Sequence, residues 1–183
     1  MGEIIKLIYY IYYMIKIKIL IIIILLIVLF LFYFTRKPVR HNKGNHLLVS
    51  PCDGTVMSVN GRNISIFLSV FDVHWQYAPI NSVIKDIEII HGKHNMAFDP
   101  SSDHNAGVKV TFDSKLGNII VTQRVGFFVR RINNHINIGD KVLQSNPYGI
   151  IMFGSRVDIV LPDKLHCILK KGDKLIGGET PLI

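Results

Sequence analysis

Three short segments of the chain contain the residue types that activated-serine chemistry requires. They read SPCDG at 50–54, FDVHW at 71–75 and FGSRV at 153–157. A carboxylate, an imidazole and a serine hydroxyl from separate strand ends can act together as base and nucleophile. Taken singly, each segment also has a structural explanation: a β-turn, a strand-end Asp–His pair and a β-bulge, respectively. Together they predict a catalytic site that contains Asp53, His74 and Ser155.

The position of Ser155 directly after Gly154 separates two kinds of chemistry. A hydrolase serine usually lies in a G-x-S-x-G elbow or a comparable exposed turn, whereas strand-like residues flank Ser155 on both sides. A serine that follows glycine can instead attack the preceding carbonyl, because glycine leaves it unhindered and permits strained backbone geometry. We therefore expect chain cleavage between Gly154 and Ser155. A hydrolase triad of Ser155, His74 and Asp53 is the disfavoured alternative.

These segments must be positioned by strands. Short runs of β-branched and aromatic residues, separated by Gly, Pro, Asn and Asp, follow residue 47. We predict strands at 54–59, 64–68, 82–90, 107–112, 119–125, 150–153 and 157–161. The stretch 127–132 suits either a short helix or a strand extension. Because no long segment with a 3.6-residue period follows residue 35, the domain is expected to be mostly β.

One short motif occurs twice, as IGDKV at 138–142 and KGDKL at 171–175. A Gly-Asp turn followed by an aliphatic residue suits a corner between strands, because Gly supplies positive φ and Asp bonds nearby backbone. Repeated corners of this kind resemble the barrel-sandwich hybrid of lipoyl and biotinyl domains. We interpret the repeat as architecture, and not as a carrier site at Lys141 or Lys174.

The N-terminal segment predicts a membrane anchor. The apolar run from Leu7 to Phe34 is 28 residues long, about 42 Å as a helix, and about 20 residues suffice to cross a bilayer. It is too long for a signal peptide, and no small-residue cleavage site follows it. We expect an anchor over residues 1–35, a linker over 36–46 and a β domain over 47–183. Arg36, Lys37, Arg40 and Lys43 favour a cytoplasmic β domain, although Lys6, Lys16 and Lys18 partly oppose this orientation.

The composition limits the classes of partner and ligand that we expect. The formal charge of +8, on a chain with an apolar anchor, favours anionic lipid over nucleic acid, for which no aromatic signature, zinc-finger spacing or basic helix is found. Two cysteines, Cys52 and Cys167, are too few for a disulfide framework and fit a reduced compartment. No metal site is expected, because His91, His94 and His104 lack a carboxylate at a ligand spacing.

With these segments in their order, the sequence resembles the phosphatidylserine decarboxylase proenzyme family, in the short form found in bacteria and archaea. The resemblance rests on S-P-x-D-G at 50–54, D-V-H…A-P at 72–79 and F-G-S-R-V-D…L-P at 153–162. It covers roughly residues 47–162. Further residues in the family's order and spacing are Gln123, Gly126, Arg130, Arg131, Gly139, Asp140, Tyr148, Gly149 and Ile150.

The resemblance implies a self-cleaving, pyruvoyl-dependent decarboxylase that converts phosphatidylserine, or a related serine phospholipid, to phosphatidylethanolamine and CO₂. Asp53, alone or with a histidine, would help the Ser155 hydroxyl attack the Gly154 carbonyl. Elimination and hydrolysis would release ammonia and leave a β chain of residues 1–154 and an α chain of residues 155–183 that begins with the pyruvoyl group. The pyruvoyl carbonyl would form a Schiff base with the substrate amine, and His74 would protonate the carbanion left by CO₂.

Tyr77 is a departure from the longer members of the family, which carry a second histidine at this position. The short members also lack that histidine, so the departure leaves the cleavage base open. It supports an alternative hypothesis, a membrane-tethered β domain that does not cleave itself and has a binding or scaffold role. The lipid tail, the type of membrane and assembly into a homo-oligomer stay open.

Overall fold

The computed structural model describes residues 2–97, 99–126, 132–152 and 155–183. The chain divides into two compact units, residues 1–36 and residues 37–183. The first contains the only α-helix in the described part of the chain, and the second contains all of the described strands.

The first unit is a single helix, α1 (Gly2–Phe34). Its side chains are apolar around the whole circumference, with Glu3, Lys6, Lys16 and Lys18 as its charged residues. The helix is long and apolar enough to cross a membrane. The prediction of one N-terminal apolar helix is therefore confirmed, and the helix begins five residues before the predicted run. Its orientation in a membrane stays a prediction.

The second unit is built on an eight-stranded antiparallel sheet, in the order β11-β1-β2-β10-β6-β5-β4-β8. The bounds are β1 (Gly54–Asn60), β2 (Asn63–Leu68), β4 (Ser82–Ile90), β5 (Gly107–Ser114), β6 (Gly117–Arg124), β8 (Lys141–Val142), β10 (Ser155–Val160) and β11 (Lys174–Leu175). A smaller sheet has the order β3-β9-β7, with β3 (Trp75–Tyr77), β7 (Ile132–Asn134) and β9 (Pro147–Ile151). One short 3₁₀ helix, η1 (Pro100–His104), lies between β4 and β5.

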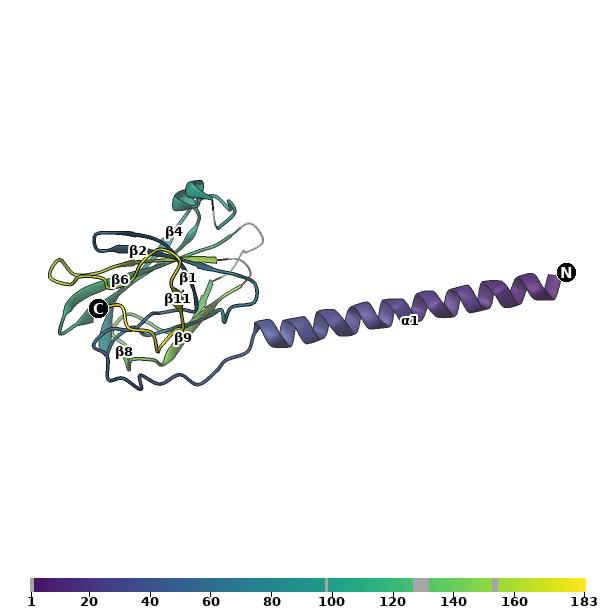
Figure 1. Ribbon diagram of the computed structural model, residues 1–183, viewed down its shortest axis with the longest axis horizontal. Helices are drawn as coiled ribbons and strands as arrows, with labels where there is room; N and C mark the ends of the chain where they lie inside the picture. The colour runs from purple at the N-terminus through teal and green to yellow at the C-terminus, as the bar shows by residue number, and fades with distance from the viewer. Residues whose placement is uncertain (1, 98, 127–131, 153–154) are drawn as a thin grey trace. The chain divides into compact units, whose positions relative to one another are not determined.

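The large sheet curls into a half-barrel around the core, as Figure 1 shows. The side chains of this sheet that form the core are buried, as expected for a sheet with one apolar face. Members of this core include Ile64 and Ile66 of β2, Val110 and Phe112 of β5, and Val157 and Ile159 of β10. The predicted mostly-β, barrel-sandwich-like fold is thus confirmed.

The repeated Gly-Asp-Lys motif forms two equivalent corners at opposite edges of this sheet. Gly139 and Gly172 have φ values of 92° and 96°, and each N–H donates to a strand carbonyl, of Ile84 and Val56 respectively. The lysine of each motif starts an edge strand, β8 or β11. The two strands have the same register on β4 and β1, with Lys141 opposite Val83 and Lys174 opposite Thr55.

The equivalence extends into the segments that pack against these corners. We call residues 50–56 with 172–178 the Asp53 corner, and residues 78–84 with 139–145 the Asn81 corner. The N–H of Gly178 donates to the Ser50 carbonyl in the first, and the N–H of Ser145 donates to the Ala78 carbonyl in the second. Gly178 and Ser145 also share a positive φ, of 75° and 68°. The two corners are therefore two copies of one local structure.

The short strands are where the sequence-based prediction falls short. The seven predicted strands correspond to β1, β2, β4, β5, β6, β9 and β10, with ends that differ by up to three residues. The strands β3, β7, β8 and β11 were not predicted, because two or three residues carry no period and form only through pairing. Of the stretch 127–132, only Ile132 is described, as the start of β7; Phe153 also lies outside the described residues.

Candidate active site

The Asp53 carboxylate lies at the edge of the sheet, directly before β1. Its Oδ1 accepts a hydrogen bond of 2.7 Å from the Gly177 backbone N–H. The guanidinium of Arg40 donates to both carboxylate oxygens, at 3.2 Å to Oδ1 and 3.0 Å to Oδ2. Both side chains are only 14% exposed, which makes this a largely desolvated ion pair.

Opposing forces act on the pKa of Asp53. Burial, the largest effect, raises this pKa above its usual value of 3.8. The hydrogen bond from Gly177 and the positive charge of Arg40 oppose that rise, and the nearby negative charge of Asp72 adds to it. The Val73 backbone N–H also lowers this pKa, so the carboxylate lies beside the residue that directly precedes His74.

His74 is fully buried. Its Nδ1 lies 2.9 Å from the backbone carbonyl oxygen of Asp72. Because a carbonyl can only accept, this contact requires a proton on Nδ1 and makes Nε2 the ring nitrogen that can gain and lose one. The turn before His74 is held by Asp72, whose Oδ2 accepts from the Ser69 N–H at 2.7 Å.

Ser155 is the first residue of β10, and its backbone pairs with Leu68, the last residue of β2. Leu68 is followed directly by the turn that leads to His74. Four residues before Ser155, the N–H of Ile151 donates to the His74 carbonyl at 3.1 Å. Since four residues span at most about 14 Å, the Ser155 backbone lies in the neighbourhood of the His74 segment. Gly154, the other predicted cleavage residue, lies outside the described residues.

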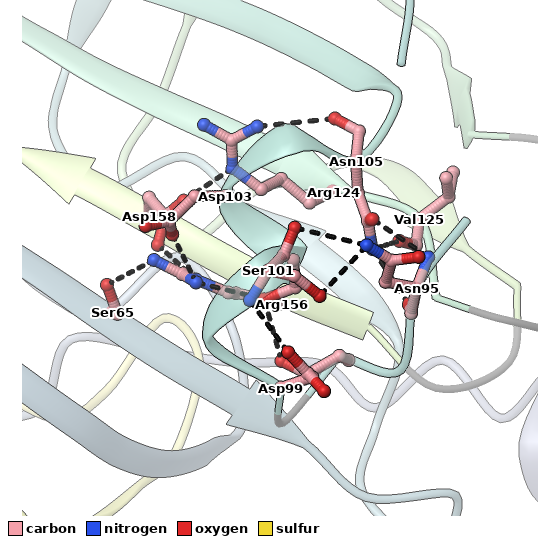
Figure 2. A network of polar contacts seen from close by, with 12 residues as sticks. Ser65, Asn95, Asp99, Ser101, Asp103, Asn105, Arg124, Val125, Arg156 and Asp158 are labelled. Carbon is pink, nitrogen blue, oxygen red and sulfur yellow. Dashed lines mark hydrogen bonds and ion pairs between the residues drawn. The ribbon is translucent and has the colours of Figure 1, made fainter. Parts of the chain in front are cut away.

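Arg156, the second residue of β10, holds the start of this strand through a network of polar contacts, as Figure 2 shows. Its guanidinium donates to Asp158 at 2.7 Å, to Ser102 at 3.0 Å and to Ser65 at 3.1 Å. It also forms an ion pair with Asp103 at 2.5 Å. The network therefore joins three elements, β2, β10 and η1, around the residue that follows Ser155.

A second arginine completes this network. The Nε of Arg124 in β6 donates to Asp158 at 2.7 Å, so Asp158 bridges two guanidinium groups. Such an arrangement is fully compensated in charge and has little backbone or side-chain freedom.

Tyr77 is fully buried, and its hydroxyl donates to the Pro38 carbonyl at 2.9 Å. Burial raises the pKa of Tyr77 above its usual value of 10.0. The phenol is therefore neutral at physiological pH and acts as a hydrogen-bond donor toward the predicted linker. It does not offer the acceptor nitrogen that a histidine would bring to this position.

The structure brings the predicted Asp53 and His74 segments together and sets the Ser155 backbone at the end of the neighbouring strand pair. Sequence reasoning missed Arg40 and Gly177. Arg40 belongs to a polar stretch that was interpreted as linker, and Gly177 lies more than a hundred residues from Asp53. No local pattern marks either of them, since both act through long-range contacts.

The chain matches one protein family over most of its length. The sequence model of the phosphatidylserine decarboxylase family matches residues 27–182. A relative from Methanococcoides burtonii, whose name describes it as an archaetidylserine decarboxylase proenzyme, is 36% identical over 96% of this chain and 81% of its own length. A phosphatidylserine decarboxylase proenzyme from Ehrlichia chaffeensis is 38% identical over 82% of this chain and 73% of its own length.

A third relative, from Methanosarcina mazei, also carries the name archaetidylserine decarboxylase proenzyme. It is 36% identical over 80% of this chain and 71% of its own length. The match includes the three segments that hold Asp53, His74 and Ser155. The chain therefore belongs to the phosphatidylserine decarboxylase family.

Proposed function

We propose that this protein is a membrane-anchored decarboxylase that cleaves itself between Gly154 and Ser155 and removes CO₂ from the serine head group of a phospholipid. The observation that carries the proposal is the contact of the Asp53 carboxylate with the residue before the buried His74. The backbone of Ser155 follows, four residues after the hydrogen bond from Ile151 to His74. Membership of the family and the apolar helix α1 support a lipid substrate.

In this proposal Asp53 acts as the base for self-cleavage. It accepts the proton of the Ser155 hydroxyl as that oxygen attacks the Gly154 carbonyl and displaces the peptide nitrogen, which converts the peptide bond to an ester. Elimination then removes the Cα proton of residue 155 and breaks the bond between its Cβ and the ester oxygen, which leaves Gly154 with a free carboxylate and residue 155 as a dehydroalanine. Water adds to the imine form of that residue and releases its nitrogen as ammonia. A buried carboxylate suits this role because desolvation makes it more basic.

A pyruvoyl group formed from Ser155 would lie at the start of β10. The α chain of residues 155–183 would stay bound after cleavage, because β10 pairs with β2 and β6, and β11 pairs with β1. When present, this group supplies a carbonyl that reacts with an amine and takes up the electrons left as CO₂ departs. His74 would hold on Nε2 the proton that the product receives in place of CO₂.

The test is the intact mass of the full chain purified in detergent, compared with that of the Ser155→Ala variant. We expect two wild-type fragments, the smaller one blocked at its N-terminus by a pyruvoyl group, and a single uncleaved variant chain. Wild-type protein should release CO₂ from a serine phospholipid, whereas the variant should not.

Two results would replace the proposal with another function. An unbroken wild-type chain without decarboxylase activity favours a binding or scaffold domain. An unbroken chain that reacts with a fluorophosphonate at Ser155 favours a serine hydrolase.

A further inference from the structure

Arg40 is the one basic side chain that contacts Asp53 within the described residues. It comes from the predicted linker, thirteen residues before its partner. Its guanidinium also lies 3.8 Å from the carboxylate of Glu179, so two acidic side chains face it. Arg40 is thus part of the surroundings of the proposed base, although it belongs to none of the three motifs.

The internal repeat shows which contact of Asp53 is architectural. At the equivalent place in the Asn81 corner, the side-chain oxygen of Asn81 accepts from the Gln144 N–H at 2.7 Å. In the Asp53 corner, Asp53 accepts from the Gly177 N–H, also at 2.7 Å. An uncharged amide oxygen therefore suffices to hold this corner. The negative charge of Asp53 and its pairing with Arg40 are additions that the fold does not need.

The linker is held where Arg40 can make this contact. The Tyr77 hydroxyl donates to the Pro38 carbonyl, and the Arg40 guanidinium lies 5.9 Å from the centre of the Tyr77 ring. A side chain at position 178 would come within 2.9 Å of the Arg40 Cβ. Gly178 thus leaves the room that the base of the Arg40 side chain occupies.

We propose that Arg40 is a positioning residue for self-cleavage, which holds the Asp53 carboxylate in one orientation and keeps it ionised. This inference rests on the proposed function of Asp53 as the cleavage base. A guanidinium suits the task because one terminal nitrogen donates to both oxygens of Asp53 while the other faces Glu179. It also stays charged at every physiological pH.

The charge balance around Asp53 explains why a cation is needed there. Burial favours the protonated acid, which cannot act as a base. Within the described residues, the titratable and charged groups near the Asp53 carboxylate are Arg40, Cys52, Asp72, Tyr77 and Glu179. Arg40 is the only cation among them. It therefore opposes both the desolvation and the neighbouring negative charges.

The experiment follows the rate at which the full chain, made in a cell-free system with detergent, breaks into two fragments at graded pH. Replacing Arg40 by Gln should slow cleavage by about tenfold or more, because a buried charged hydrogen bond is lost. It should also move the acid limb of the rate profile to higher pH, because the carboxylate loses its counter-charge. Arg40→Lys should keep the wild-type position of the limb and lose part of the rate, since Lys provides the charge but lacks the second terminal nitrogen that faces Glu179.

Arg62→Gln is the matched control, because Arg62 also pairs with an aspartate, Asp163, but at an exposed turn. It should cleave at the wild-type rate. Arg40→Gln with a wild-type rate and pH profile would overturn the role of Arg40 alone. A slower rate with an unmoved acid limb and a lower unfolding temperature would also overturn that role. Arg40 would then only hold the linker in place. A wild-type chain that never cleaves would overturn the proposed function together with this inference.

Discussion

Asp53 makes two kinds of contact, one that its counterpart Asn81 also makes and one that is its own. The shared contact, to a backbone N–H of the opposite segment, closes a corner of the fold. The second contact, to Arg40, depends on the negative charge of Asp53. A single residue therefore serves both stability and the proposed chemistry, and the repeat allows the two to be separated experimentally.

The substitution Asp53→Asn separates stability from the proposed chemistry, because an amide oxygen can still accept from the Gly177 N–H. We expect a folded chain whose free energy of unfolding falls by about 1–3 kcal/mol, because Arg40 loses its charged hydrogen bonds to Asp53 and keeps Glu179 nearby. Self-cleavage should fall by about a hundredfold or more, since the base is lost. Circular dichroism during denaturant unfolding and intact-mass time courses measure the two quantities.

Asn81→Asp is the control in the other corner and should cleave like the wild type. Because the Asp53→Asn variant has an Asn-Gly pair, which deamidates to the acid, its mass is checked before each time course. A mass-verified variant that cleaves at the wild-type rate would show that Asp53 is not the base.

At the scale of elements, the two Gly-Asp-Lys corners end the large sheet in the same way. In each, the aspartate side chain accepts at 2.7 Å from a backbone N–H three residues earlier, that of Lys170 or of Asn137. Each glycine has a φ above 90° and open space where a Cβ would lie. Backbone strain, and not a steric clash, therefore sets the effect of any substitution at these two positions.

Gly139→Ala and Gly172→Ala should each lower the free energy of unfolding by about 1–3 kcal/mol, because a side chain disfavours this φ. The two values should agree closely, since the corners are copies. Denaturant unfolding measures both. Gly61→Asn serves as control: its φ of 60° suits Asn, its surroundings are open, and little change is expected. A large difference between the two corners would contradict their equivalence.

At the scale of the whole molecule, the described contacts of Asp53, His74 and Ser155 reported above lie within residues 37–183. The apolar helix is a separate compact unit, and the part of the predicted linker that contacts Asp53 belongs to the second unit. The anchor and the proposed chemistry are therefore separable along the chain, at a point before Arg40.

Deletion of residues 1–36 should release the protein from membranes and leave self-cleavage intact. Deletion of residues 1–46 should also release it but slow cleavage by about tenfold or more, because Arg40 is removed with its charged hydrogen bonds. Membrane fractionation and fragment analysis of both variants test this. Equal cleavage rates of the two truncated chains would show that residues 37–46 have no role in self-cleavage.

The sequence by itself determined the elements and the chemistry that depend on local pattern. The apolar run gave α1, alternating β-branched residues gave the long strands, and the segments around Asp53, His74 and Ser155 indicated the family. The repeated Gly-Asp-Lys motif indicated the barrel-sandwich architecture, because a few adjacent residues are enough to specify a turn with a positive φ at glycine.

Only the tertiary structure decided which distant residues meet. The pairing of Arg40 with Asp53, the donor Gly177, and the hydrogen bond from Tyr77 to Pro38 join segments up to 124 residues apart. The two-residue strands β8 and β11 form for the same reason, through their pairing partners. Such contacts arise when the sheet curls and brings distant chain segments together. They cannot be predicted from the local pattern of apolar residues.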